Sequence, residues 1–180
     1  MSTKKEQHKS KKMKTTNSED VPLEAITSSL LCSVNHARSA TEIMVSDKKK
    51  IKTYYDEDKF YCQLLKTTDD DCEVGVTLDE NQFRNLLNFC DVLEKKLITV
   101  MLAITFGEKE KPYRQSIDDM IFCSVNCHYP LVDVREFYMT KDGDLKPTRR
   151  GVAYDLHQFR RVRSALDRIA RILVASYSAV

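Results

Sequence analysis

Lysines alternate with a tyrosine along one short stretch of the sequence, "KKKIKTYYDEDKF", which begins at Lys48. Lys50, Lys52 and Tyr54 fall two residues apart, so an ideal strand places them on one face. Cations spaced in this way can follow the phosphates of a nucleic-acid strand, and a flat ring can stack on a base. The pattern also suits a solvated edge strand whose lysines prevent aggregation, and acidic residues 56–58 would repel phosphate. The candidates for nucleic-acid contact in this stretch are Lys49, Lys50, Lys52, Tyr54 and Lys59.

Signals for catalysis or metal binding are weak. The four histidines lie near no glycine-flanked serine or fixed carboxylate motif, and there is no P-loop or dinucleotide fingerprint. The six cysteines have no CxxC spacing, and the tightest cluster, "CSVNCH" at 123–128, lacks a second pair of ligands at finger-like distance. We therefore predict no enzymatic activity, no metal site and no cofactor.

Charge is distributed unevenly along the chain, although the formal net charge is only +2. Residues 1–20 hold six lysines and three acidic residues but almost no apolar ones, so we expect a disordered basic tail that either finds polyanions or serves as a solubilising segment. The N-terminus lacks the apolar run of a secretory signal, and the longest apolar stretch, 97–106, is too short to cross a bilayer. We expect an intracellular protein with reduced cysteines and no membrane partner.

The periodicity of apolar residues predicts strands followed by a helix, twice. In the first half, runs at 51–55 and 59–65 flank a polar turn as in a hairpin, and 73–78 forms a further strand. Asp79 then caps a helix over about 80–98. In the second half we expect a strand at 103–107, a polar stretch at 108–119, two strands within 120–139, a charged connection at 140–150, and a strand at 151–154 before a helix capped by Asp155.

Two twelve-residue segments share six identical positions: "GVTLDENQFRNL" begins at Gly75 and "GVAYDLHQFRRV" at Gly151. In both, a glycine begins a short strand, an aspartate caps a helix and Gln-Phe-Arg falls in the first turns of that helix. Because the surrounding elements also recur in the same order, a duplication explains the match. The predicted fold class is α+β, with two copies of an antiparallel sheet that is followed by one helix.

The second half resembles the single-stranded-DNA-binding domain of the family of RNA polymerase II transcriptional coactivators known as positive cofactor 4. The resemblance covers residues 131–166 and is carried by "VDVREFYM", "GDLKP", "RRGV" and the helix start at 155–159. The first half is similar over 43–65 and 74–87, but a shorter, acidic "TTDDDCEVG" replaces the basic connection. The resemblance implies curved antiparallel sheets that work as a dimer, and hence an intramolecular pseudo-dimer in this chain, with further homodimerisation left open.

The same resemblance places the nucleic-acid contacts mainly in the second half. It implies that Arg135 and Tyr138 lie in the binding region, although strand alternation points them to opposite faces, and that the basic connection grips phosphates through Lys146, Arg149 and Arg150. Tyr129 is an additional candidate for stacking on a base. The alternative for the arginines and lysines is structural pairing, such as Arg135 with Asp133.

Two hypotheses about function follow from this resemblance. In the first, the chain binds single-stranded or melted DNA, with RNA also possible, and acts as a transcriptional coactivator or in genome maintenance together with proteins of the transcription machinery. In the second, it is a protein-interaction adaptor on the same fold with weakened nucleic-acid binding. Both imply action in the nucleus or, for a viral protein, at the site of viral transcription. The expected organisation is a tail at 1–20, a divergent repeat at 21–98 and a repeat closer to the family at 99–180.

Overall fold

The computed structural model describes residues 40–178 as two four-stranded antiparallel sheets, each followed by a long helix. The predicted basic tail lies outside the described residues. The first unit has strand order β1-β2-β3-β4 and the second β5-β6-β7-β8, so each sheet is a simple meander. The elements of the first unit are β1 (Thr41–Ser46), β2 (Lys49–Asp56), β3 (Lys59–Thr67), β4 (Glu73–Asp79) and α2 (Glu80–Phe106). Those of the second unit are β5 (Tyr113–Ser116), β6 (Ile121–Val125), β7 (Val132–Met139), β8 (Leu145–Tyr154) and α3 (Leu156–Ser178). The predicted α+β class is confirmed.

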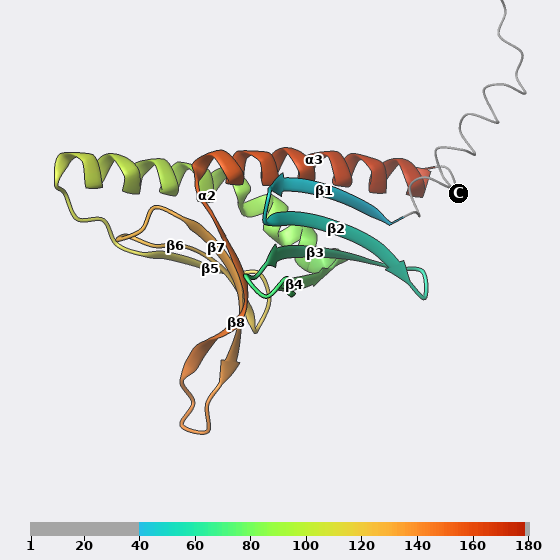
Figure 1. The fold of residues 1–180 in the computed structure, drawn as a ribbon, viewed down its shortest axis with the longest axis horizontal. Helices are drawn as coiled ribbons and strands as arrows, with labels where there is room; N and C mark the ends of the chain where they lie inside the picture. Colours follow the sequence, from blue (N-terminus) through green and yellow to red (C-terminus); the bar gives the residue numbers. More distant parts are fainter. Residues whose placement is uncertain (1–39, 179–180) are drawn as a thin grey trace, which may run out of the picture.

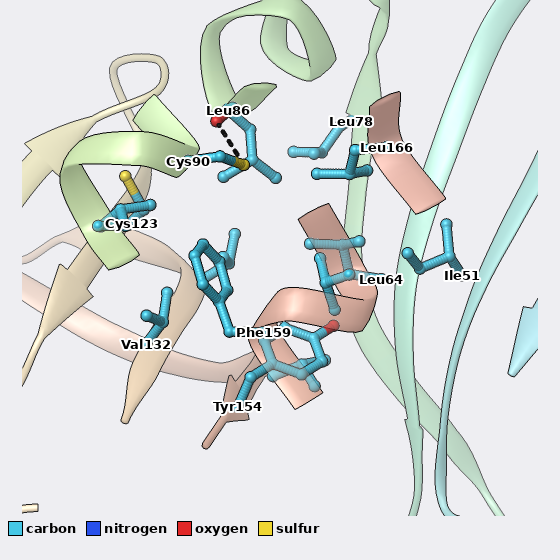
Figure 2. Close-up of a cluster of buried hydrophobic side chains, with 14 of the residues drawn as sticks. Ile51, Leu64, Leu78, Leu86, Cys90, Cys123, Val132, Tyr154, Phe159 and Leu166 are labelled. Carbon is cyan, nitrogen blue, oxygen red and sulfur yellow. Dashed lines mark hydrogen bonds between the residues drawn. The ribbon is translucent and has the colours of Figure 1, made fainter. Parts of the chain in front are cut away.

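The two helices lie together on one side of the molecule, with one sheet beneath each end of the pair (Figure 1). Each helix contacts strands of both sheets, and residues of both units share one hydrophobic cluster. Figure 2 shows Leu64 and Leu78 of the first unit in the same core as Tyr154 and Phe159 of the second. This arrangement is consistent with an intramolecular pseudo-dimer.

Ion pairs join the two helices along their antiparallel contact. Glu94 of α2 accepts from Arg160 at 2.7 Å and from Arg163 at 2.9 Å, and Arg163 also pairs with Asp91. The hydrogen bond from Arg160 is the main reason why the pKa of Glu94 is lowered. The Glu94 side chain is only 14% exposed, whereas its partners Arg160 and Arg163 are 56% and 38% exposed. The cluster therefore links α2 to α3 around one largely buried carboxylate.

The repeated sequence segments mark equivalent positions in the two units. Asp79 accepts from the backbone N–H of Gln82 at 2.8 Å, and Asp155 accepts from that of Gln158 at the same distance. The glycine before each cap is the register partner of a residue on the preceding strand, Leu65 for Gly75 and Arg135 for Gly151. The repeated glycines and aspartates therefore position the last strand of each sheet and begin the helix that follows it.

One sequence-based assignment near the junction of the units is wrong, and two others are incomplete. Residues 103–106 do not form a strand but the last turns of α2, because Leu97, Val100 and Ala103 continue its buried stripe until Gly107 ends the helix in the left-handed conformation. The polar stretch contains β5, and the charged connection contains the first half of β8. Position 98, the predicted boundary between repeats, lies inside α2.

Tyr154 carries the one buried side-chain polar atom without a hydrogen-bond partner among residues 40–178, its hydroxyl oxygen. The ring is fully buried, burial raises the pKa of the hydroxyl, and Lys49 Nζ lies 5.6 Å from the ring centroid. We expect Tyr154→Phe to raise the free energy of unfolding by about 1 kcal/mol, because it removes an unpaired buried hydroxyl and keeps the ring. Urea unfolding measures the change. Tyr154→Leu is the control, since it loses the ring as well, and a loss of stability in Tyr154→Phe would contradict the prediction.

No helix within residues 40–178 is both long enough and apolar enough to span a membrane.

Candidate nucleic-acid interface

The first sheet has one face against the helices and one open face. Ile51, Cys62, Leu64 and Leu78 are buried, whereas the residues that alternate with them, apart from the buried Leu65, are partly or fully exposed. Register places side chains of the open face in cross-strand rows, of which one runs from Lys52 through Gln63 to Thr77. Gln63 donates to Thr77 at 3.1 Å, so this row is ordered as far as the edge strand β4.

Two tyrosines form an aromatic platform next to that row. Tyr54 and Tyr61 are register partners on β2 and β3, and their rings stack with centroids 5.3 Å apart and planes at 20°. Lys59 lies two residues before Tyr61 and therefore on the same face. Lys52 and Lys59 form no ion pair with other residues of the described range. Tyr61 was missed in the sequence, and the signal that could have found it is its register opposite Tyr54 across the predicted hairpin.

Two other candidates of the first unit are engaged elsewhere. Lys50 lies on the open face but pairs with Glu42 at 3.0 Å and Glu73 at 2.5 Å, and the hydrogen bond to Glu73 is the main reason why its pKa is raised. Lys49 faces the second unit, where its ammonium donates to Ala153 O and Gln158 Oε1, both at 2.7 Å. Partial burial lowers the pKa of Lys49. Lys49 thus acts as a contact between the units.

The β7–β8 hairpin projects from the body of the molecule, away from the helices (Figure 1). Tyr138 and Lys146 are register partners on it and therefore share a face. Tyr138 is half exposed, and Lys146 and Arg149 are exposed without an ion pair in the described part of the chain. Arg150 is 71% exposed and lies 3.5 Å from Glu136, a separation that leaves its guanidinium open to other anions. The hairpin thus brings four of the predicted residues together.

Arg135 has a structural role that the sequence offered as an alternative. Its guanidinium donates to Asp133 at 2.8 Å and to Thr148 O at 2.8 Å, and its side chain lies across Gly151. Only 24% of the side chain is exposed. By alternation along β7, Arg135 faces away from Tyr138. These contacts hold the bulge of β8 against β7.

Tyr129 lies apart from the other candidates of the second unit. It is 70% exposed in the turn between β6 and β7, at the opposite end of β7 from Tyr138. Seven residue steps of strand, roughly 23 Å, separate Val132 from Met139. One contact region therefore contains Tyr138 and the basic residues of the hairpin but not Tyr129. A nucleic-acid strand would reach both tyrosines only by following the whole length of β7.

The open face of the second sheet differs from that of the first. Arg114 lies over the rings of Phe122 and Phe137, at 5.9 Å and 4.9 Å from their centroids, and the two rings meet edge to face. Phe137 is only 7% exposed. These rings are therefore covered by one another and by Arg114, which leaves little aromatic surface for a base.

A hollow of about 500 Å³ lies between the units, where β4 approaches β7 and β8. Its lining combines the open-face edge of the first sheet with one face of the hairpin, through Gly75, Thr77, Gln82, Met120, Glu136 and Arg150. Gln82 donates to Asp118 at its rim, at 2.5 Å. The hollow thus connects the polar row of the first sheet to the basic hairpin of the second.

Within residues 40–178, no group of three or more His, Cys, Asp or Glu side chains is placed so that it could hold a metal ion. Cys123 of the tightest cysteine cluster is buried in the core, and burial raises its pKa to about 12.

Comparison with known protein families matches residues 128–165 to the family Transcriptional Coactivator p15 (PC4). The match contains β7, β8 and the first turns of α3, and it includes the whole basic hairpin. It does not extend to the first unit, so the tandem duplication rests on the sequence repeat and on the matching order of elements. No curated protein matches the chain.

Proposed function

We propose that this protein binds single-stranded or melted DNA and acts as a transcriptional coactivator. The observation that carries the proposal is the β7–β8 hairpin: within the stretch matched by the coactivator family, it presents Tyr138 beside Lys146, Arg149 and Arg150 on a projecting, solvated surface. This is a binding role, and we propose no catalytic activity.

The chemistry of the hairpin favours single strands over a duplex. A tyrosine ring can stack only on a base whose face is free, and such stacking contributes roughly 1–3 kcal/mol per base. In duplex DNA the base faces are covered by their neighbours, so only the lysine and the arginines would find partners there. Because every base has a π-face, we expect little sequence preference, and the same contacts suit a single strand of RNA.

The family match also favours a place of action and a class of partner. A coactivator of transcription works in the nucleus or, for a viral protein, where viral genes are transcribed, and it contacts proteins of the transcription machinery. Both assignments rest on the match at residues 128–165.

A protein-interaction adaptor is the second candidate, and the charges of the first unit favour it. Lys50 is neutralised by two glutamates. Lys48, in the turn between β1 and β2, pairs at 2.7 Å with Asp69 of the acidic turn between β3 and β4. In addition, Met101, Leu102 and Phe106 are exposed at the end of α2. An adaptor of this kind would not need the hairpin cations.

Fluorescence anisotropy tests the proposal with labelled DNA of about 20 nucleotides, single-stranded and duplex, at several salt concentrations. We expect tighter binding to the single strand. In the variant Lys146→Ala/Arg149→Ala/Arg150→Ala, we expect much weaker binding and a salt slope smaller by about 2, because each phosphate contact on a single strand contributes roughly 0.7.

The matched control removes three exposed cations elsewhere, Lys109→Ala/Arg168→Ala/Arg171→Ala, and we expect it to bind as the wild type does. An equal loss of affinity for the single strand in both variants would mean that overall charge, and not the hairpin, drives binding. Absence of binding to any oligonucleotide, including an RNA of the same sequence, would favour the adaptor.

A further inference from the structure

The two units are not equivalent at their β-hairpins. Leu65 and Gly75 are register partners in the first sheet, and Arg135 and Gly151 are the corresponding partners in the second. Nine residues separate the first pair and fifteen the second. The first unit therefore turns tightly through acidic residues 69–71 with the single cation Lys66, whereas the second extends a hairpin that carries several cations.

The units also differ at the hollow. Ile51 pairs with Leu64 as Cys123 pairs with Val134, so Lys49 of β2 and Ile121 of β6 are equivalent. On one side of the molecule Lys49 reaches across to Gln158 and Ala153 O and closes the junction between the units. On the other side Ile121 is apolar and cannot make these bonds, and the junction holds the hollow of about 500 Å³.

A third difference concerns the open faces. The stacked Tyr54 and Tyr61 correspond by register to Asn126 and Leu131, and Asn126 accepts from the backbone N–H of His128 at 2.7 Å in its own turn. The second sheet thus lacks the tyrosine platform. The stacked tyrosines, Lys52 and Lys59 lie on the first sheet, whereas Tyr138 and the exposed cations of the hairpin lie on the second.

We propose that a single strand of nucleic acid follows one path that crosses between the units, so that each chain binds one strand. The path begins at the Tyr54–Tyr61 platform, passes Lys52, Gln63 and Thr77, crosses the hollow, and ends at Arg150, Tyr138 and Lys146. This inference rests on the proposed function and assigns the first unit a direct part in it.

The structure gives two reasons why a second, symmetry-related path is not formed. Along it a strand would meet the closed junction at Lys49 in place of the hollow. It would also meet the open face of the second sheet, where Arg135 is held by Asp133 and the phenylalanine rings are covered. Neither phosphate nor base would find the partners that the first path offers.

Stoichiometry provides the first test. A labelled single strand of about 12 nucleotides, a length within the range that single-strand-binding surfaces cover, is held far above its Kd and titrated with the full chain. We expect saturation at one strand per chain. Saturation at two strands per chain would overturn the proposal.

Variants on both units provide the second test. We expect Tyr61→Ala on the first sheet and Tyr138→Ala on the hairpin each to raise the Kd for the single strand by about fivefold or more. In the double variant the Kd should rise by the product of the two factors, because both tyrosines contact the same strand. With independent sites, each single variant would keep one site of full affinity. That outcome would contradict the proposal of a single path.

Two single-cation variants form a matched pair for the open faces. Lys52→Ala lies on the first sheet and Arg114→Ala on the second, and both positions are solvent-accessible. We expect the salt slope to fall by roughly 0.7 in Lys52→Ala and to stay unchanged in Arg114→Ala. The reverse result contradicts the path, whereas a wild type that binds no single strand contradicts the proposed function itself.

Discussion

Phe159→Ala is expected to lower the free energy of unfolding by about 3–5 kcal/mol and to destabilise both sheets in one transition. Phe159 is completely buried at the start of α3, within the cluster that also holds Leu64 and Leu78 of the first sheet. Removing the ring leaves a cavity between the units, since the surrounding side chains collapse only in part. A loss of that size is a large fraction of the stability of an ordinary domain.

Urea unfolding followed by circular dichroism measures the decrease in the free energy of unfolding of Phe159→Ala. Amide hydrogen exchange shows which strands lose protection. We expect protection to decrease equally in β3 of the first sheet and β7 of the second, because the two sheets share one core. Val174→Ala, an exposed position on the same helix, is the control and should change stability by less than about 0.5 kcal/mol. Full protection of β3 in Phe159→Ala would show that the units fold independently.

Gly75→Ala is expected to destabilise the protein by at least about 3 kcal/mol, and Gly151→Ala by clearly less. A Cβ atom at Gly75 would overlap the backbone carbonyl of Leu64, which the sheet holds in place. At Gly151 the new Cβ atom would meet the side chain of Arg135 at 2.8 Å, and a long side chain can shift. The two glycines occupy equivalent positions in their sheets. A difference in destabilisation between the two variants therefore reports on the atoms that each new Cβ atom would meet.

Thermal unfolding of the two variants checks this ranking. For Gly151→Ala we also expect weaker pairing of Arg135 with Asp133, since the guanidinium must move, and Gly151→Ala/Arg135→Ala should recover part of the loss. Equal destabilisation by the two single variants would contradict the steric explanation.

Much of the fold could be predicted from local sequence. The hairpin of β2 and β3, the strand before each helix and the caps at Asp79 and Asp155 all rest on periodicity and turn chemistry within a few residues, and they are confirmed. Strand β5 could not be predicted, because "YRQS" forms a strand only through its pairing with β6. At 103–106 the β-branched and aromatic residues favour a strand locally, but burial of Ala103 prolongs the helix.

In the candidate site, too, local sequence predicts some features, whereas others depend on contacts between distant residues. Residues two apart on one strand can be placed on one face from the sequence, and this rule groups Lys50, Lys52 and Tyr54. The sequence could not show that Lys50 is neutralised by Glu42 and Glu73, because such pairs depend on side-chain conformation. For the same reason it offered the pair of Arg135 with Asp133 only as an alternative. It also could not reveal the hollow, whose walls come from both units.

Covalent linkage of the two units has a consequence for how the molecule can change over evolutionary time. In an assembly of two identical chains, every substitution appears twice, so a residue that helps on one side must also be tolerated on the other. Here Lys49 and Ile121 fill equivalent positions with opposite chemistry, and each can be selected separately. The linked arrangement also persists at any dilution, whereas a pair of separate chains falls apart as its concentration drops. A rarely expressed protein could therefore keep two specialised halves together.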